Sequence, residues 1–201
     1  MRTIETKVYK FEELSEEVQE KVIEKNRHIN IYHDWWDSVY EMYMEDETGF
    51  DINKIYFSGF WSQGDGAMFE GSPNKDILHF ITPGYNNKEY QKDWYRVIKL
   101  IKNGHINIYG SFTHQGHYYH SKSYSDNLDA EMTNDWYGKT YSRIGDILED
   151  ILEEIREHYE DTCNKIYRSL EQEHEWLTGD EQIIETIECN DYEFTSEGEL
   201  I

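Results

Sequence analysis

Residues 140–177 read TYSRIGDILEDILEEIREHYEDTCNKIYRSLEQEHEWL, and this stretch decides the fold because its apolar side chains recur every three or four positions. That spacing matches the helical turn of about 3.6 residues, so the stretch is predicted to form one long helix. The side of this helix that faces the core contains Ile144, Leu148, Ile151, Ile155, Tyr159, Cys163, Ile166, Leu170 and Leu177.

The remaining surface of the predicted helix is strongly acidic. Between Gly145 and Asn164 the only basic residue is Arg156. Solvent-exposed helix faces usually mix both signs, and crowding like charges costs stability, which suggests that the negative field is used in binding. The candidate partner-binding residues are Asp146, Glu149, Asp150, Glu153, Glu154, Glu157, Glu160 and Asp161.

The density of these charges can be compared with that of a nucleic acid. Residues 145–177 carry 11 carboxylates over a helix of about 50 Å, or about one charge per 4.5 Å. A DNA duplex carries one charge per about 1.7 Å and a single strand one per about 3.4 Å. One helix is therefore too dilute to imitate a duplex, but the acidic tail or a second copy of the chain in a homo-oligomer would raise the density.

Composition restricts the possible functions further. The chain has 201 residues, 42 acidic against 19 basic, and a formal net charge of −23, which disfavours direct binding to nucleic acids or anionic membranes. It contains no long apolar run and no signal-peptide pattern, and its two cysteines, Cys163 and Cys189, are expected to be buried thiols in a reducing compartment. These features predict a cytoplasmic protein without a membrane segment.

Residues 1–201 are interpreted as a single α+β domain with a mainly antiparallel, twisted sheet packed against helices. The N-terminal residues 3–11 and the segments 50–60, 67–70, 105–112 and 117–125 have strand patterns, and 15–26, 32–47 and 90–102 have helical ones. Residues 178–201 are expected to form a short helix, started by a capping box of Thr178 and Glu181, and a hairpin-like tail.

The segment 57–71, FSGFWSQGDGAMFEG, has two possible interpretations. Its glycines could present backbone N–H groups to a phosphate, but a phosphate loop is followed by a helix and a lysine, whereas this segment continues into a strand and contains a carboxylate. The favoured interpretation is a hairpin turn with positive φ angles. In the alternative, Trp61, Gln63 and Asp65 line a small-molecule pocket.

The histidines His114, His117 and His120 raise a metal-binding hypothesis. On a strand, residues three apart point to opposite faces, so the three side chains would not converge, and no metal or cofactor is expected. Pairs of carboxylates do not indicate a hydrolytic site in so acidic a chain. Cys163 and His158 are interpreted as core residues and not as a nucleophile and its base. The chain is therefore expected to bind and not to catalyse.

Four stretches together resemble a known group of proteins: VYKFEELSEEVQEKVIEKN (8–26), FSGFWSQGDGAMFEG (57–71), GHYYHSKS (116–123) and YRSLEQEHEWLTGDEQIIETIECNDYEF (167–194). They are similar to small accessory proteins of tailed phages and prophages that have no assigned activity. The resemblance implies a phage origin and action inside the host bacterium, and it supplies no catalytic residues.

Two functions are therefore expected. The first is a phage-encoded inhibitor whose acidic, nucleic-acid-mimicking surface binds a basic protein surface on a bacterial immune component. The second is a non-catalytic sponge that holds a nucleotide-derived immune signal in an aromatic pocket near Trp61, Gln63 and Asp65. An enzymatic function would rest on the histidine run alone.

Overall fold

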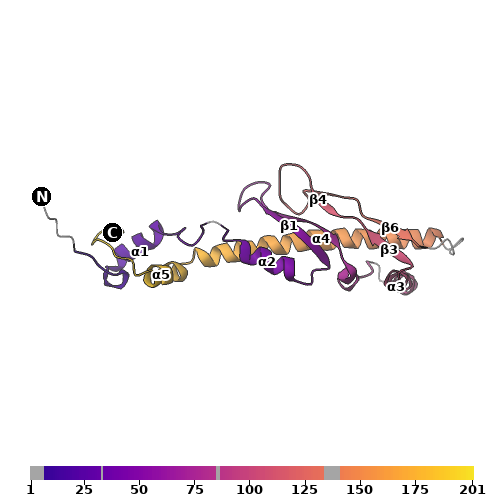
Figure 1. The fold of residues 1–201 in the computed structure, drawn as a ribbon, viewed down its shortest axis with the longest axis horizontal. Helices are drawn as coiled ribbons and strands as arrows, with labels where there is room; N and C mark the ends of the chain where they lie inside the picture. Colours follow the sequence, from indigo (N-terminus) through magenta and orange to yellow (C-terminus); the bar gives the residue numbers. More distant parts are fainter. Residues whose placement is uncertain (1–6, 33, 85–86, 134–140) are drawn as a thin grey trace. The chain divides into compact units, whose positions relative to one another are not determined.

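The computed structural model describes residues 7–32, 34–84, 87–133 and 141–201 (Figure 1). Its helices and antiparallel strands confirm the predicted α+β class and the long C-terminal helix. The chain divides into two compact units: unit 1 contains residues 1–38 and 170–201, and unit 2 contains residues 39–169. None of the helices in the described ranges has the length and apolarity that a bilayer crossing requires.

Unit 2 is built on a four-stranded antiparallel sheet with the strand order β1-β2-β4-β5. β1 and β2 form a hairpin, and β2 meets β4 at the pair Gly71↔Phe112. A second sheet pairs β3 with β6. The strands are β1 (Phe50–Phe57), β2 (Ala67–Pro73), β3 (Ile106–Tyr109), β4 (Phe112–His114), β5 (Tyr124–Asp126) and β6 (Asp129–Met132).

The four later strands are two arms of one long hairpin. The last pair of the β3–β6 ladder is Tyr109↔Asp129, and the first pair of the β4–β5 ladder is Phe112↔Asp126. Three residues therefore separate the two pairs on each arm. The register is therefore continuous across the break, although the ladder itself is interrupted. The loop 115–123 forms the tip of this hairpin.

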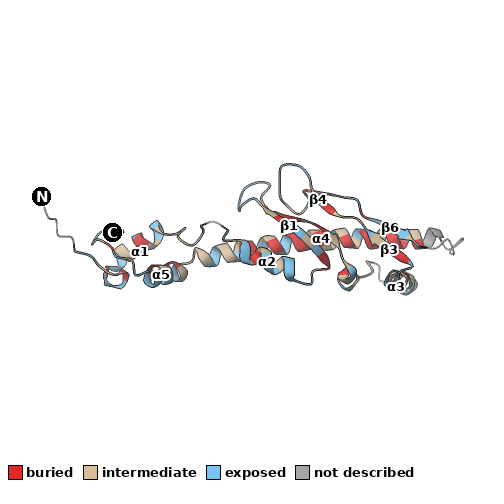
Figure 2. Ribbon diagram, in the orientation of Figure 1, coloured by how far each residue is buried: buried red, intermediate tan, exposed pale blue. Residues whose placement is uncertain are grey.

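The long helix α4 (Tyr141–Leu177) supplies the other half of the unit 2 core. All predicted seam residues from Ile144 to Leu170 are buried, whereas Leu177 is half-buried. Figure 2 shows buried and exposed positions alternating along this helix. Tyr159 lies at the centre: its ring stacks on Phe112 at 3.9 Å between centroids, and its hydroxyl donates to the Phe69 carbonyl at 2.7 Å. The sheet and the helix thus bury each other's apolar faces.

Three further helical segments complete this part of the chain: α2 (Asp37–Glu45), the 3₁₀ helix η2 (Lys75–His79) and α3 (Lys88–Lys102). The Asn87 side chain caps α3 by accepting from the backbone N–H groups of Glu89 and Tyr90. Trp94 and Val97 are the buried residues of α3, and the helix confirms the helical pattern predicted over 90–102.

A charged contact joins α4 to the long hairpin. The Arg156 guanidinium donates to both carboxylate oxygens of Asp126, each at 3.1 Å, from largely buried positions. Burial alone would raise the pKa of Asp126. The hydrogen bonds from Arg156 and from the Leu128 backbone N–H, together with the charge of Arg156, outweigh burial and hold that pKa below its usual value. A carboxylate with a lowered folded-state pKa stabilises the fold at neutral pH.

Replacing Arg156 with glutamine should therefore lower the free energy of unfolding at pH 7 by about 1–3 kcal/mol. The contribution is present above the unfolded pKa of aspartate, about 3.9, and is lost as pH falls through the lowered folded value. Urea unfolding from pH 7 to pH 3 should show the difference between wild type and variant shrinking with acidity. Arg168→Gln, an exposed change on the same helix, is the control. An equal loss in both variants would contradict the assignment.

Unit 1 has its own core. Helices α1 (Glu16–Lys25) and α5 (Asp180–Cys189) and the 3₁₀ helix η1 (Phe11–Glu13) meet around Phe11, Leu14, Val22, Ile183, Ile187 and Phe194. Phe194 pairs as an isolated bridge with Tyr9 on one side and with Leu200 on the other. The chain end after α5 therefore turns back on itself, and Arg27 joins α1 to the start of α5 through Asp180 and the Thr178 carbonyl.

Several expected boundaries were wrong at the N-terminal side. Residues 3–6 of the expected first strand lie outside the described residues, and of the rest Tyr9 makes only a bridge before η1 begins. The helix expected over 32–47 begins at Asp37, and the strand expected over 50–60 ends at Phe57. In the latter case the chain leaves the sheet at Gly59, which has a φ of 113°.

Three corrections concern later residues. Of the strand expected over 117–125, only Tyr124 and Ser125 belong to β5, because the preceding residues form the hairpin tip. Gly179, not Thr178, is the N-cap of α5; the Thr178 hydroxyl donates back to the His174 carbonyl at 2.8 Å. Cys163 is buried as expected, but Cys189 is exposed at the end of α5.

Candidate functional site: an acidic face and a pair of loops

The eight predicted partner-binding carboxylates fall into two groups. Those that are exposed lie opposite the buried seam of α4, because successive residues turn by about 100° around the helix axis. They follow one another at three- and four-residue steps over about 22 Å. These residues, called the acidic face below, are Asp146, Glu149, Glu153, Glu157 and Asp161.

The other three carboxylates are half-buried and contact the body of unit 2. Asp150 accepts a hydrogen bond from the Tyr90 hydroxyl at 2.5 Å. Glu160 lies 3.7 Å from the Lys122 amine and accepts from the Tyr124 hydroxyl at 3.4 Å. Burial, together with the charges of Glu157 and Asp150, raises the pKa of Glu154. These side chains serve the packing of α4 more than its outer surface.

Cations within the chain neutralise little of the acidic face. Arg156 reaches Glu153 at 3.2 Å, but its guanidinium is mainly engaged by Asp126. Within the described ranges, no ion pair is formed by the other four residues of the face. The face therefore keeps most of its negative potential available to a partner.

Two loops at one end of unit 2 lie against each other. They are the β1–β2 connection, 58–66, and the hairpin tip, 115–123. Gly64 lies so close to the Tyr118 ring that a Cβ on it would come within 2.3 Å of a ring carbon, and one on Gly66 would come within 2.5 Å of the His120 Cα. Sequence reasoning did not predict that the glycine segment and the histidine segment meet; we call them the paired loops.

The three residues of the predicted ligand pocket lie on the first of these loops. The Asp65 carboxylate accepts from the Ser62 backbone N–H at 2.7 Å, so it is directed into its own turn. Gln63 is exposed, and the Trp61 side chain is 77% exposed with a φ of +65°. The hairpin interpretation fits this geometry, whereas a pocket among these residues stays a prediction.

The histidine segment is held by local contacts. His114, at the end of β4, stacks on Tyr56 and its Nε2 lies 3.2 Å from the Tyr118 carbonyl oxygen. The His120 Nδ1 accepts from the Lys122 backbone N–H at 3.1 Å, and His117 is exposed. Across the residues that were described, no three side chains of metal-ligating type converge.

Cys163 and His158, considered above as a possible nucleophile and base, each have a different environment. Burial raises the pKa of the Cys163 thiol to about 12. The His158 ring lies between Phe50 and Phe80, and its Nε2 is 2.8 Å from the Thr48 carbonyl oxygen. Burial lowers the pKa of His158, which favours a neutral ring that donates to that carbonyl.

The contact between the paired loops gives a testable expectation for Gly64. Gly64→Ala should lower the free energy of unfolding by about 2–4 kcal/mol, because it adds strain at a φ of +89° and a clash with Tyr118. Gly116→Ala is the matched control: its φ is +93°, but nothing lies within 4 Å of its added Cβ. It should cost only about 1–2 kcal/mol. Equal losses in urea unfolding would show that the loops do not touch.

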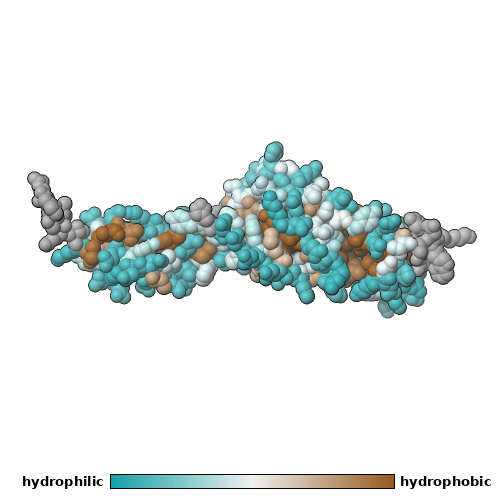
Figure 3. All heavy atoms as spheres, in the orientation of Figure 1, coloured by the Kyte–Doolittle hydropathy of each residue, from teal (hydrophilic) through white to brown (hydrophobic). Residues whose placement is uncertain are grey.

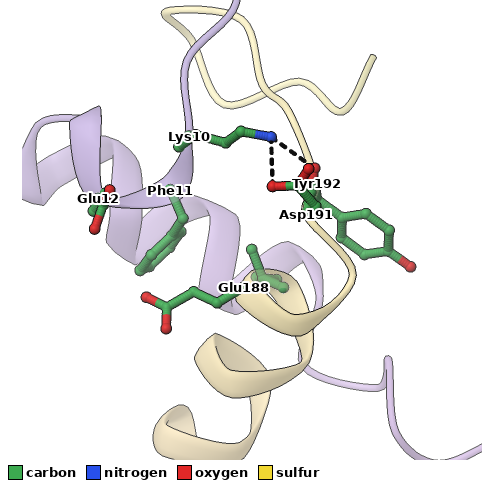
Figure 4. A pocket seen from close by; sticks show the side chains of 7 residues that line it. Lys10, Phe11, Glu12, Glu188, Asp191 and Tyr192 are labelled. Carbon is green, nitrogen blue, oxygen red and sulfur yellow. Dashed lines mark hydrogen bonds and ion pairs between the residues drawn. The ribbon is translucent and has the colours of Figure 1, made fainter.

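Two cavities lie elsewhere. One of about 250 Å³ in unit 1 is bordered by Phe11, Glu188 and Tyr192, and there the Lys10 amine pairs with the Asp191 carboxylate at 2.8 Å (Figure 4). Another, of about 340 Å³ in unit 2, lies between η2 and β3. Neither is lined by a residue predicted from the sequence to bind a partner or ligand.

In comparison with known proteins, a family model matches residues 35–180. The chain belongs to the DUF8835 family. This family is described as a domain of unknown function. The DUF8835 match includes the acidic face and both paired loops, so both surfaces belong to the family domain. No curated protein and no solved structure matches the chain.

Proposed function

We propose that this DUF8835 protein acts by binding, and that its acidic face occupies a basic surface on a partner protein. The observation that carries the proposal is the arrangement on α4: five exposed carboxylates over about 22 Å, with Arg156 committed to Asp126 on the neighbouring hairpin. Stability alone would not favour such a face, because repulsion between adjacent like charges lowers the stability of the fold.

The proposed partner surface is one that ordinarily holds a nucleic acid. The spacing of the carboxylates is closer to the phosphate spacing of a single strand than to that of a duplex, so a groove for single-stranded nucleic acid fits best. The net charge of −23 would also speed encounter with such a surface. Two copies side by side would bring the density nearer to that of a duplex.

The resemblance to phage accessory proteins directs the proposal to a class of target. In this account the protein is made in the host cytoplasm during infection and inhibits a nucleic-acid-binding component of bacterial immunity. It does so by occupying the groove and without chemistry of its own. The resemblance supports the setting, and the acidic face supports the mode of binding.

The proposal is tested by capturing proteins from bacterial lysates on the immobilised full chain. Retention of the inhibited component should fall steeply between about 50 mM and about 500 mM salt, because exposed charges are screened within a few ångströms at high ionic strength. Single-stranded DNA should compete for the same component. Retention that is indifferent to salt would remove this mechanism.

A further inference from the structure

The paired loops differ in charge from the rest of the chain. About one residue in five of the whole sequence is acidic, yet the eighteen residues of 58–66 and 115–123 include one carboxylate, Asp65, and one lysine, Lys122. The Asp65 carboxylate is engaged by the Ser62 backbone N–H. Lys122 lies on the hairpin tip with its amine 3.7 Å from Glu160, and Lys54 lies 4.3 Å over the ring of Tyr56, which stacks on Tyr119 of the tip. This is a weakly charged surface on a strongly acidic protein.

The loops present aromatic side chains from a backbone that is held in place. Trp61 is 77% exposed and Tyr118 is 56% exposed. Contacts of Gly64 with Tyr118 and of Gly66 with His120 fix the loops to each other. Within the tip, Gln115 and Ser123 are joined by a backbone hydrogen bond of 2.9 Å. Rigid aromatic side chains bind with little loss of conformational entropy.

The surface projects outward. Figure 1 shows both loops extending past the strands that carry them, at the turn ends of the β1–β2 and β4–β5 hairpins. Small molecules are usually bound in concave sites, whereas a projecting aromatic side chain suits a pocket on another protein. Trp61 also has a φ of +65°, a conformation that costs a bulky residue energy and recurs at functional sites.

We propose that the paired loops are a second protein-binding surface, and that the partner offers a largely uncharged pocket, with a weakly acidic rim, for the indole of Trp61. Tryptophan and tyrosine dominate the binding energy of protein interfaces, and the centres of interfaces are depleted of charge. The partner's rim is assigned as weakly acidic because it would lie opposite the positive charges of Lys54 and Lys122. Tyr118, which packs against Gly64 of the same pair of loops, extends the contact.

This surface acts independently of the acidic face. The acidic face points away from the sheet, because the seam on the opposite side of α4 packs against Phe69 and Phe112. The loops are continuations of that sheet. Binding through them should therefore survive both high salt and neutralisation of the acidic face.

A photo-crosslinking amino acid placed at Gln63 of the full chain tests the proposal in a panel of bacterial hosts. Gln63 is exposed beside Trp61, and Gln172, exposed on α4, is the control position. Irradiation should give a discrete protein adduct at 63 and none at 172. Trp61→Ala should reduce its yield about 30-fold or more, the effect expected of an interface hot spot. Trp176→Ala, at a tryptophan that is 55% exposed, should leave it unchanged.

Other results of the same crosslinking experiment would overturn the proposal. No adduct specific to position 63 in any host, or an adduct that survives both Trp61→Ala and Tyr118→Ala, would show that the loops are not a protein-binding surface. An adduct removed by nuclease would assign the loops to nucleic acid instead. Thermal unfolding of each variant distinguishes loss of binding from loss of fold. A loss of the adduct when all five carboxylates of the acidic face are changed to the matching amides would show that the two surfaces are one.

Discussion

Tyr159→Ala should lower the free energy of unfolding of unit 2 by about 3–5 kcal/mol, the range for removing a buried aromatic side chain. Tyr159 is fully buried. Its ring lies 3.9 Å from that of Phe112 and 4.5 Å from that of Phe69. The variant loses these contacts and leaves a cavity between α4 and the sheet. Urea unfolding followed by far-ultraviolet circular dichroism measures the change.

Tyr159→Phe is the matched control, because it keeps the ring and removes only the hydroxyl. The Phe69 carbonyl then loses the hydrogen bond of 2.7 Å, so this variant should cost about 1–2 kcal/mol. If Tyr159→Ala and Tyr159→Phe lowered the free energy of unfolding equally, the ring contacts would not be what holds the helix to the sheet. A loss below about 1 kcal/mol with alanine would contradict the described core.

The helical seam is the part of the fold that the sequence predicts best. A period of about 3.6 residues sustained over many turns depends only on local geometry, so Ile151, Ile155 and Tyr159 could be assigned to the core before any contact was known. The same period places Glu153 and Glu157 outside. Their exposure follows from the seam and needs no tertiary information.

Contacts between distant segments could not be predicted in this way. Gly64 meets Tyr118, and Arg156 meets Asp126, across separations in sequence at which periodicity says nothing. Strand ends were misplaced for a related reason: the aromatic and histidine residues of 117–123 favour a strand locally, but they form the turn of the long hairpin.

The visible surface of unit 2 agrees with a protein whose function lies in polar side chains. Hydrophilic residues cover most of it, and apolar ones show in narrow strips (Figure 3). The two proposed binding surfaces differ accordingly: the acidic face would act through charge, and the paired loops through aromatic side chains.

Neutralising the acidic face should weaken binding to the proposed basic partner by about 5-fold to about 4,000-fold. The estimate takes about 0.2–1 kcal/mol for each exposed ion pair made with the partner. The variant is Asp146→Asn, Glu149→Gln, Glu153→Gln, Glu157→Gln and Asp161→Asn. Because these side chains are exposed on a helix and the substitutions keep their size, the fold should be unchanged or slightly stabilised.

The control removes the same number of charges from exposed positions of unit 1: Glu12→Gln, Glu20→Gln, Glu181→Gln, Glu188→Gln and Glu197→Gln. Both variants change the formal net charge from −23 to −18, since each loses five carboxylates. A difference between them therefore reports the position of the charge and not its total. Long-range attraction alone would weaken both equally.

The most direct test of the account is a titration of the purified partner, captured at low salt, with wild type and these two five-fold variants at about 50 mM and about 500 mM salt. The variant with a neutralised acidic face should bind weakly at both salt concentrations, whereas the control should keep tight, salt-sensitive binding. Equal affinity of the two variants, or wild-type binding unchanged by salt, would contradict it.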